Sequence, residues 1–173
     1  IFGKVYFPRI IVPLSKVLSG LINFLVQFIF FTCIYIYFLF FEHNQKLEPS
    51  MELFFLVPLM VFQMAMLGQG MGMAISSLTI KYRDLTYLIG FGTQLMMYAS
   101  PIVYPLSSVP EKYKYLIYAN PVTPIIEGFR FIFLGTGVFN FSLIIISSLI
   151  TSFFFFTGLI FFNKAEKSFI DSI

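Results

Sequence analysis

The sequence predicts an all-α integral membrane protein with four transmembrane helices and two short re-entrant helices between the third and the fourth. Composition is the first reason: hydrophobic residues make up 58% of the 173-residue chain, charged residues 11%, and Phe alone contributes 25 residues. Soluble domains carry about a quarter charged residues, and a core of this size cannot hide so much apolar surface. Lipid is therefore expected to solvate much of the chain.

Four apolar runs are the second reason, and they cover residues 14–41, 53–80, 85–104 and 141–162. Each run has the roughly 20 residues that a helix needs to cross about 30 Å of hydrocarbon. Backbone groups in lipid must find their hydrogen bonds within the segment, which favours helices. We therefore expect residues 1–173 to form a single transmembrane domain.

The third reason is a segment over residues 105–140 that prolines divide into short pieces. Pro105, Pro110, Pro121 and Pro124 separate two apolar stretches, 113–119 and 125–134, that are too short to span a membrane. The phenylalanine and isoleucine side chains of the second stretch would be costly on a wet surface. The segment is expected to be an external, re-entrant gate, which requires cover by protein or a water-filled cavity. The alternative is an ordinary external loop with surface helices.

Lysine and arginine predict the orientation, because cytoplasmic loops carry an excess of both. With four spans, one side of the membrane would hold Lys4, Arg9, Lys16, Lys81, Arg83, Lys164 and Lys167. The other side would hold Lys46, Lys112, Lys114 and Arg130. The first side, with both ends of the chain, is therefore expected to be cytoplasmic.

A polar stripe runs along the first expected span, where Ser15, Ser19, Asn23 and Gln27 recur every fourth residue. At 3.6 residues per turn these side chains share one slowly drifting face. Polar groups in a membrane helix face other helices or water rather than lipid. The stripe is therefore either one wall of a transport path suited to sugars, or a set of interhelical hydrogen bonds.

Small residues mark the second expected span, where Gly68 and Gly72 form a GxxxG pair around Gly70. Such residues let two helices approach closely. Helix packing is the favoured interpretation, since the glycines lie within an apolar helix and not in a phosphate-binding loop between a strand and a helix.

Two opposite charges, Glu127 and Arg130, stand three residues apart in the second short stretch. This spacing lets them pair on one helix face, and near a membrane they are costly unless paired. They are expected to form a structural latch of the outer gate; the alternative is a surface ion pair of small effect. Tyr98 and Tyr104 lie near this segment and either anchor it at the membrane interface or line a path for sugars.

No catalytic constellation is visible in the sequence. His43 is the single histidine, Cys33 the single cysteine, and no Walker A pattern is present. No second histidine or cysteine is placed to share a metal ion. The chain is therefore expected to bind no cofactor of its own, to be no enzyme, and to depend on an outside energy source.

Five motifs in order carry a resemblance: Lys4-Val5-Tyr6-Phe7-Pro8-Arg9, Lys81-Tyr82-Arg83-Asp84, Ser100-Pro101-Ile102-Val103-Tyr104-Pro105, Asn120-Pro121 and Glu127-Gly128-Phe129-Arg130. With the spans between them, they resemble the ABC-2 type transporter permeases along essentially the whole chain. Within that superfamily the chain is similar to the permeases that export O-antigen, capsular and teichoic-acid polymers.

The resemblance implies a permease of six membrane helices, of which this chain would be a C-terminal fragment without the first two. Residues 1–13 would form a cytoplasmic coupling segment that docks onto an ABC ATPase. The residues expected to carry the coupling are Lys4, Tyr6, Phe7, Pro8 and Arg9. The outer gate would contain Pro101, Pro105, Pro121, Glu127 and Arg130, and the substrate path Ser19, Asn23, Gln27, Tyr98 and Tyr104.

The function expected from this resemblance is ATP-driven export of a lipid-linked polysaccharide across the bacterial cytoplasmic (inner) membrane. Two permeases and two ATPase subunits would form the transporter, and ATP and Mg would be bound by the ATPase. The alternatives are an ABC-2 permease for drugs or small molecules, a membrane enzyme of glycolipid assembly, and a purely structural membrane scaffold.

Overall fold

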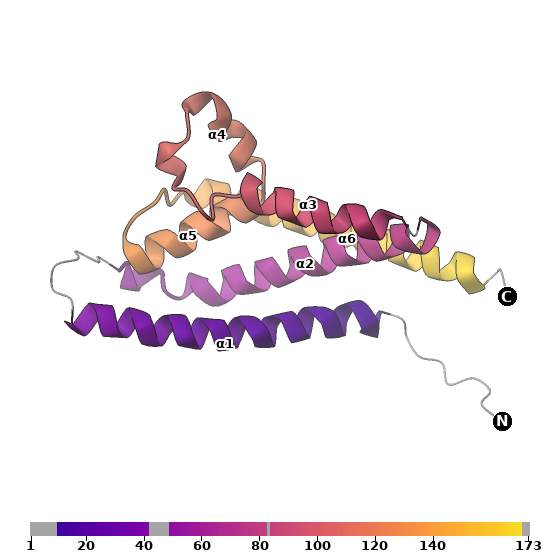
Figure 1. The fold of residues 1–173 in the computed structure, drawn as a ribbon, viewed down its shortest axis with the longest axis horizontal. Helices are drawn as coiled ribbons and strands as arrows, with labels where there is room; N and C mark the ends of the chain where they lie inside the picture. Colours follow the sequence, from indigo (N-terminus) through magenta and orange to yellow (C-terminus); the bar gives the residue numbers. More distant parts are fainter. Residues whose placement is uncertain (1–9, 42–48, 83, 171–173) are drawn as a thin grey trace.

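A computed structural model describes residues 10–41, 49–82 and 84–170 (Figure 1). The helices are α1 (Ile11–Phe41), α2 (Leu56–Lys81), α3 (Leu85–Ala99), α4 (Glu111–Tyr118), α5 (Val122–Leu134) and α6 (Phe141–Ile170). Two 3₁₀ turns, Met51–Leu53 and Leu106–Ser108, precede α2 and α4. No strand occurs among these described residues, so the prediction of an all-α fold is confirmed.

Three of these helices are long and apolar enough to cross a membrane. They are Ile11–Phe41 with a mean hydropathy of 2.3, Leu56–Thr79 with 1.3, and Phe141–Ala165 with 2.3. The predicted runs over residues 14–41, 53–80 and 141–162 differ from these bounds by three residues or fewer at each end. A helix of 31 residues such as α1 is about 46 Å long, well beyond the roughly 30 Å of hydrocarbon.

The third expected span is shorter than predicted. A helix over 85–104 was expected, but α3 ends at Ala99. Ser100 is extended, with φ −101° and ψ 144°, because the ring of Pro101 disfavours the helical conformation in the residue before it. Fifteen helical residues measure only about 22 Å, so α3 by itself does not span the bilayer, and the four-span arrangement stays a prediction.

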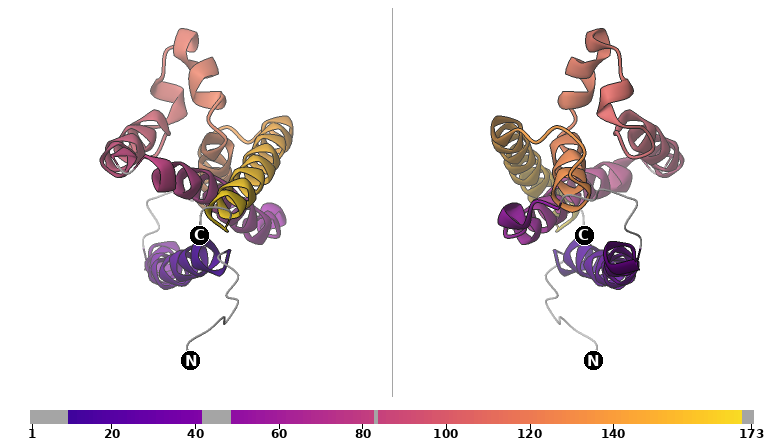
Figure 2. Two further views of the ribbon diagram at one scale, coloured as in Figure 1. Left: turned by 90° about the vertical axis from the view of Figure 1, so that its right-hand side faces the viewer. Right: turned by 90° about the vertical axis from the view of Figure 1, so that its left-hand side faces the viewer.

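Helices α2 and α6 form the centre of the molecule and share its most extensive contact. Helix α1 lies along another side of α2, and α3 lies on the side away from α1 (Figures 1 and 2). Helix α5 packs against both α2 and α6. A Cβ atom added at Gly70 would lie 2.6 Å from the Cα atom of Phe155, and one added at Gly158 would collide with the carbonyl group of Gly70. These two glycines therefore permit the backbones of α2 and α6 to touch.

The glycines predicted to pack a helix pair are a different set. Gly68 and Gly72 have no atom within 4 Å of an added Cβ, so the expected GxxxG contact is wrong for the described residues. Gly70 lies between them in sequence, and the helical rotation of about 100° per residue turns it toward α6. The prediction that glycine permits a close helix contact was right, but the face of α2 that packs is that of Gly70 and not that of Gly68 and Gly72.

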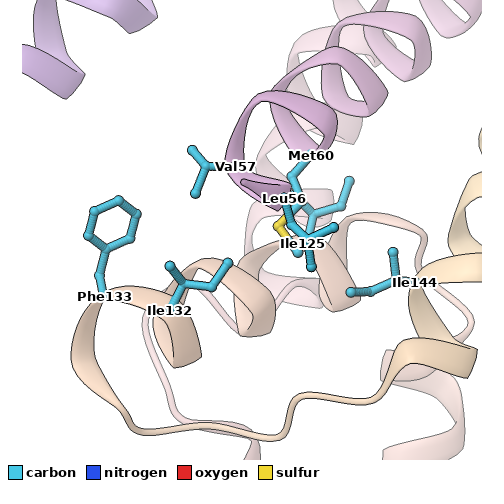
Figure 3. Close-up of a cluster of buried hydrophobic side chains, with 7 residues drawn as sticks. All are labelled: Leu56, Val57, Met60, Ile125, Ile132, Phe133 and Ile144. Carbon is cyan, nitrogen blue, oxygen red and sulfur yellow. The ribbon is translucent and has the colours of Figure 1, made fainter. Parts of the chain in front are cut away.

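A cluster of seven apolar side chains joins α5 to α2 and α6 (Figure 3). Leu56, Val57 and Met60 come from α2, Ile125, Ile132 and Phe133 from α5, and Ile144 from α6. Gly128 belongs to the same contact, because a Cβ atom there would collide with the terminal methyl group of Met60. Burial of these side chains provides the main driving force that fixes α5 on the bundle.

The two short helices of the 105–140 segment have different surroundings. Helix α5 carries seven buried residues, whereas α4 carries none and projects away from the bundle (Figures 1 and 2). Burial of α5 explains why a surface-loop interpretation does not suit its apolar residues. Re-entry of α4 and α5 into the membrane stays a prediction.

Candidate functional site

The latch, which consists of Glu127 and Arg130, lies on α5. Nη1 of Arg130 donates to Oε1 of Glu127 at 2.6 Å. The Glu127 side chain is 3% exposed and that of Arg130 is 19% exposed. The expected ion pair is therefore formed, and its burial excludes the alternative of an ordinary surface pair. A charge-assisted hydrogen bond in such surroundings is among the stronger kinds.

Both ends of the latch reach beyond α5. Nη2 of Arg130 donates to the carbonyl oxygen of Pro101 at 3.0 Å, and Oε2 of Glu127 accepts the backbone N–H of Val138 at 3.2 Å. The latch thus joins the turn after α3, helix α5, and the connection from α5 to α6. Gly137 permits this geometry, because its φ is +122° and an added Cβ would lie 2.9 Å from Oε2 of Glu127.

A small cavity of about 170 Å³ adjoins the latch. Pro105, Glu127 and Arg130 line it together with the α5–α6 connection. With Pro101 bonded to Arg130, four of the five residues expected at the outer gate lie at one place. Pro121 is the fifth, and it lies at the other end of α5, where that helix begins.

Pro121 belongs to a second polar cluster that the sequence analysis did not find. Nε2 of Gln63 on α2 donates to Oγ of Ser147 on α6 at 2.7 Å, and the Ser147 hydroxyl donates to the carbonyl oxygen of Pro121 at 2.5 Å. The adjacent Asn120 donates from Nδ2 to Oγ of Ser100 at 2.8 Å. The start of α5 is therefore fastened to α2, to α6 and to the end of α3. The sequence signal that could have identified this cluster is the presence of polar side chains within or beside apolar runs.

The aromatic end of α1 contacts α5, which sequence reasoning also missed. The hydroxyl of Tyr35 donates to the carbonyl oxygen of Phe133 at 2.7 Å. The rings of Phe28, Phe31 and Tyr35 lie edge-on to the Phe133 ring, with centroids 5.4–5.8 Å apart. Such edge-to-face pairs add to the free energy of area burial. Helix α1 therefore has a specific attachment to α5.

The polar stripe of α1 points away from this bundle. Ser15, Ser19, Asn23 and Gln27 are all exposed. The opposite side carries the half-buried residues Pro13, Val17, Leu21, Phe24 and Phe28. The hydroxyls of Ser15 and Ser19 donate to carbonyl oxygens within α1, at 2.9 Å each. Within the described residues the stripe thus makes no interhelical hydrogen bond.

The two path tyrosines lie at the end of α3, where the hydroxyl of Tyr104 donates to the carbonyl oxygen of Tyr98 at 3.1 Å. Helix α3 and helix α1 lie on opposite sides of α2 (Figures 1 and 2). The structure therefore brings Tyr98 and Tyr104 together but does not place them beside Ser19, Asn23 and Gln27. A shared path through all five residues stays a prediction.

A comparison with protein families decides the class of this bundle. The sequence model of the ABC-2 type transporter family matches residues 5–134. This range includes the turn after α3, both short helices and the latch. The chain belongs to the ABC-2 type transporter family. It is accordingly an integral membrane protein, and the family is one of transporter permeases rather than enzymes.

Two proteins from Klebsiella pneumoniae, both described as O-antigen export system permease protein RfbA, are similar to this ABC-2 chain. One is 30% identical over 172 residues and the other 29% over 179 residues. Each alignment covers 99% of the chain and 63% of the relative. The chain thus spans less than two thirds of the length of these curated relatives.

The remaining predicted site residues of this ABC-2 chain are those of the coupling segment. Lys4, Tyr6, Phe7, Pro8 and Arg9 lie outside the described residues, which begin at residue 10. Helix α1 starts immediately after them, at Ile11. Among the described residues no three side chains of His, Cys, Asp or Glu gather where they could hold a metal ion.

Proposed function

We propose that this chain is the transmembrane permease subunit of an ATP-driven exporter that moves a lipid-linked polysaccharide across the cytoplasmic membrane. The observation that carries the proposal is the alignment of 99% of the chain with O-antigen export permeases. ABC-2 type permeases normally work with an ABC ATPase. Two permease copies and two ATPase subunits would form the transporter, and ATP and Mg would bind to the ATPase.

The contacts of α1 support a route from the ATPase to the outer gate. The coupling segment that contains Lys4–Arg9 would dock onto the ATPase, and α1 follows it as one continuous helix of 31 residues. The far part of α1 holds α5 through the Tyr35–Phe133 hydrogen bond. A displacement of the coupling segment would therefore move α5, because a packed helix transmits motion as a rigid element.

The latch suits the role of a gate because it joins three segments through few bonds. Glu127 and Arg130 hold the α3 turn and the α5–α6 connection in one arrangement. A second arrangement of these bonds would open a path beside α5, and buried ion pairs are suited to specify such discrete states. Tyr98 and Tyr104 would then face sugars near the outer end of α3.

Export itself tests the proposal. Disruption of the gene is expected to leave lipid-linked polysaccharide inside the cell and to remove it from the surface, as measured by surface-specific antibody or lectin staining. Arg9→Glu in the full-length protein is expected to lower export while the ATPase still hydrolyses ATP, because the reversed charge disturbs docking. Lys114→Ala, on the exposed helix α4, is the matched control and should export normally.

Normal surface polysaccharide after gene disruption would contradict the proposed substrate and favour a permease for small molecules. Enzymatic activity on a glycolipid without any ATPase would instead favour a membrane enzyme. Coupled export by the Arg9→Glu variant at the original rate would disprove the role of the coupling segment while leaving the substrate class intact.

The membrane orientation gives a separate prediction. Single cysteines replace Ser108, beyond the outer end of α3, and Tyr87, which is 85% exposed near its start, in a Cys33→Ser background. In spheroplasts an impermeant thiol reagent is expected to label position 108, and position 87 only after permeabilisation, because positive residues favour the cytoplasmic side. Rapid labelling of position 87 in intact spheroplasts would show the opposite orientation.

A further inference from the structure

The two ends of helix α5 are bonded to different parts of the molecule. At its start, the Gln63 amide of α2 donates to the Ser147 hydroxyl of α6 at 2.7 Å, and this hydroxyl donates to the carbonyl oxygen of Pro121 at 2.5 Å. The side chains of Gln63 and Ser147 are both buried. The start of α5 is thereby bonded to the interior of the two helices that form the centre of the molecule.

The segment just before α5 is fixed at the same place. Nδ2 of Asn120 donates to Oγ of Ser100 at 2.8 Å, and Oδ1 of Asn120 accepts the backbone N–H of Val122 at 3.0 Å. The hydroxyl of the buried Thr123 donates to the carbonyl oxygen of Ile117 at 2.7 Å. Buried polar groups are costly to leave unbonded, so these bonds resist any displacement of the start of α5.

The far end of α5, residues 132–134, forms no hydrogen bond to α2 or α6 among the described residues. The carbonyl oxygen of Ile132 accepts the N–H of Ser50 at 3.1 Å, and that of Phe133 accepts the hydroxyl of Tyr35 at 2.7 Å. The latch, one turn earlier, bonds to the turn after α3 and to the α5–α6 connection. The partners of this end are therefore α1 and three connecting segments.

Apolar contacts do not distinguish the two ends, because the buried cluster includes residues from both of them. Such contacts are non-directional, and packed helices slide past one another by small shifts. Hydrogen bonds, by contrast, restrict both the distance and the angle between two groups. The pattern of hydrogen bonds therefore determines which end of α5 is the more firmly placed on α2 and α6.

Helix α1 contacts the end of α5 that lacks these bonds. The rings of Phe28, Phe31 and Tyr35 surround the ring of Phe133. An α-helix rises 1.5 Å per residue, so Phe133 lies about 18 Å along the helix from Pro121. Turning α5 by about 10° about its start would displace Phe133 by about 3 Å. A small movement of α1 is thus sufficient to separate the groups that the latch joins.

We propose that Gln63 and Ser147 are positioning residues that hold the start of α5 as a fixed pivot. A displacement of α1 then turns α5 about this pivot and moves its far end, together with the latch. This inference rests on the proposed function, in which α1 moves with the ATPase cycle. It adds which end of α5 moves, and it assigns a role to two residues outside the latch and the coupling segment. Without the pivot α5 would follow α1 as a whole.

Distances between spin labels test the pivot in the full-length permease bound to its ATPase. One label is placed on α6 at Leu149, which is exposed, and the other at Ala119, just before α5, or at Leu134, its last residue. Complexes without nucleotide are compared with complexes trapped by ATP and vanadate, each diluted with unlabelled permease. The distance from position 134 is expected to change by about 3 Å, and the distance from position 119 to stay the same.

Two variants remove the pivot to different extents. Gln63→Met keeps a side chain of similar size and leaves the Ser147–Pro121 bond intact, whereas Ser147→Ala removes both bonds. In each variant the label before α5 should now move on trapping. Polysaccharide exported per ATP hydrolysed should fall about fivefold, the factor by which losing one buried hydrogen bond shifts an equilibrium.

Ser148→Ala is the matched control, because the Ser148 hydroxyl donates within α6, to the carbonyl oxygen of Ile144 at 2.9 Å. It should change neither the distances nor the export per ATP. If Gln63 and Ser147 served only to stabilise the fold, their variants would lower the unfolding temperature while the label before α5 stayed in place. That result would overturn the proposal, and the mild Gln63→Met variant gives it even where Ser147→Ala does not fold.

Equal changes of the two distances in the unaltered chain would also overturn the pivot, because α5 would then move as a whole. A larger change at position 119 would place the pivot at the latch instead. The proposed function fails separately. Turning of α5 without export of polysaccharide would support the pivot and reject the substrate, whereas export without a change at either position would reject the pivot alone.

Discussion

Replacing Arg130 by alanine is expected to destabilise the protein by about 3–5 kcal/mol and to abolish export, because it leaves the buried carboxylate of Glu127 unpaired. Glu127 is only 3% exposed and keeps a single bond, to the N–H of Val138. The carbonyl oxygen of Pro101 loses its donor in the same variant. Thermal unfolding of the purified protein and surface polysaccharide in cells measure the two effects.

The chain offers a matched control for this variant. Lys114 and Glu111 form an ion pair with the same spacing of three residues, at 3.2 Å, but the Glu111 side chain is 94% exposed. Lys114→Ala should therefore cost at most about 1 kcal/mol. A double variant with Glu127→Gln and Arg130→Met removes both charges and should recover part of the lost stability. Equal small effects at positions 114 and 130 would contradict the latch.

Gly158→Ala is expected to have the second largest effect, because its new methyl group would occupy the space of the Gly70 carbonyl. Backbone atoms cannot rotate aside as a side chain can, so α2 and α6 must separate along their length. Overpacking of this kind costs about 1–3 kcal/mol or more. A lower unfolding temperature and reduced yield of folded protein are the measured outcomes.

Gly68→Ala and Gly72→Ala are the controls for the helix contact. Neither added Cβ has a heavy atom within 4 Å, and alanine in a helix is favoured over glycine by about 0.5–1 kcal/mol. Both variants should therefore be as stable as the original chain or more stable. A loss of stability at position 68 or 72 that matches position 158 would show that the predicted GxxxG face packs after all.

The latch illustrates how far local sequence reasoning reaches. Glu127 and Arg130 are three residues apart in one helix, so the helical repeat alone predicts that they meet. Their other partners, Pro101 and Val138, are 29 and 11 residues away. No local repeat determines such contacts, because they depend on where α3 ends and how the α5–α6 connection turns.

The polar stripe on α1 also has one property that the helical repeat determines and one that distant contacts determine. Its spacing of four residues predicts one shared face, and the structure has all four residues exposed. The direction of that face depends on which other side of α1 packs best. Phe28, Phe31 and Tyr35 surround Phe133, and this aromatic contact turns the stripe away from the bundle.

The sequence by itself determined that lipid surrounds much of the chain, where the helices lie, where prolines interrupt them, and which family the chain belongs to. It could do so because hydrophobicity, the helical repeat and backbone restriction act within short stretches of chain. The end of α3 at Ala99 is one of these local features, because Pro101 keeps Ser100 out of the helical conformation. Only the tertiary structure decided that Gly70 and not Gly68 meets α6, and that a groove separates α1 from α2. These features depend on the competition among helix faces for contact area, which an individual helix does not encode.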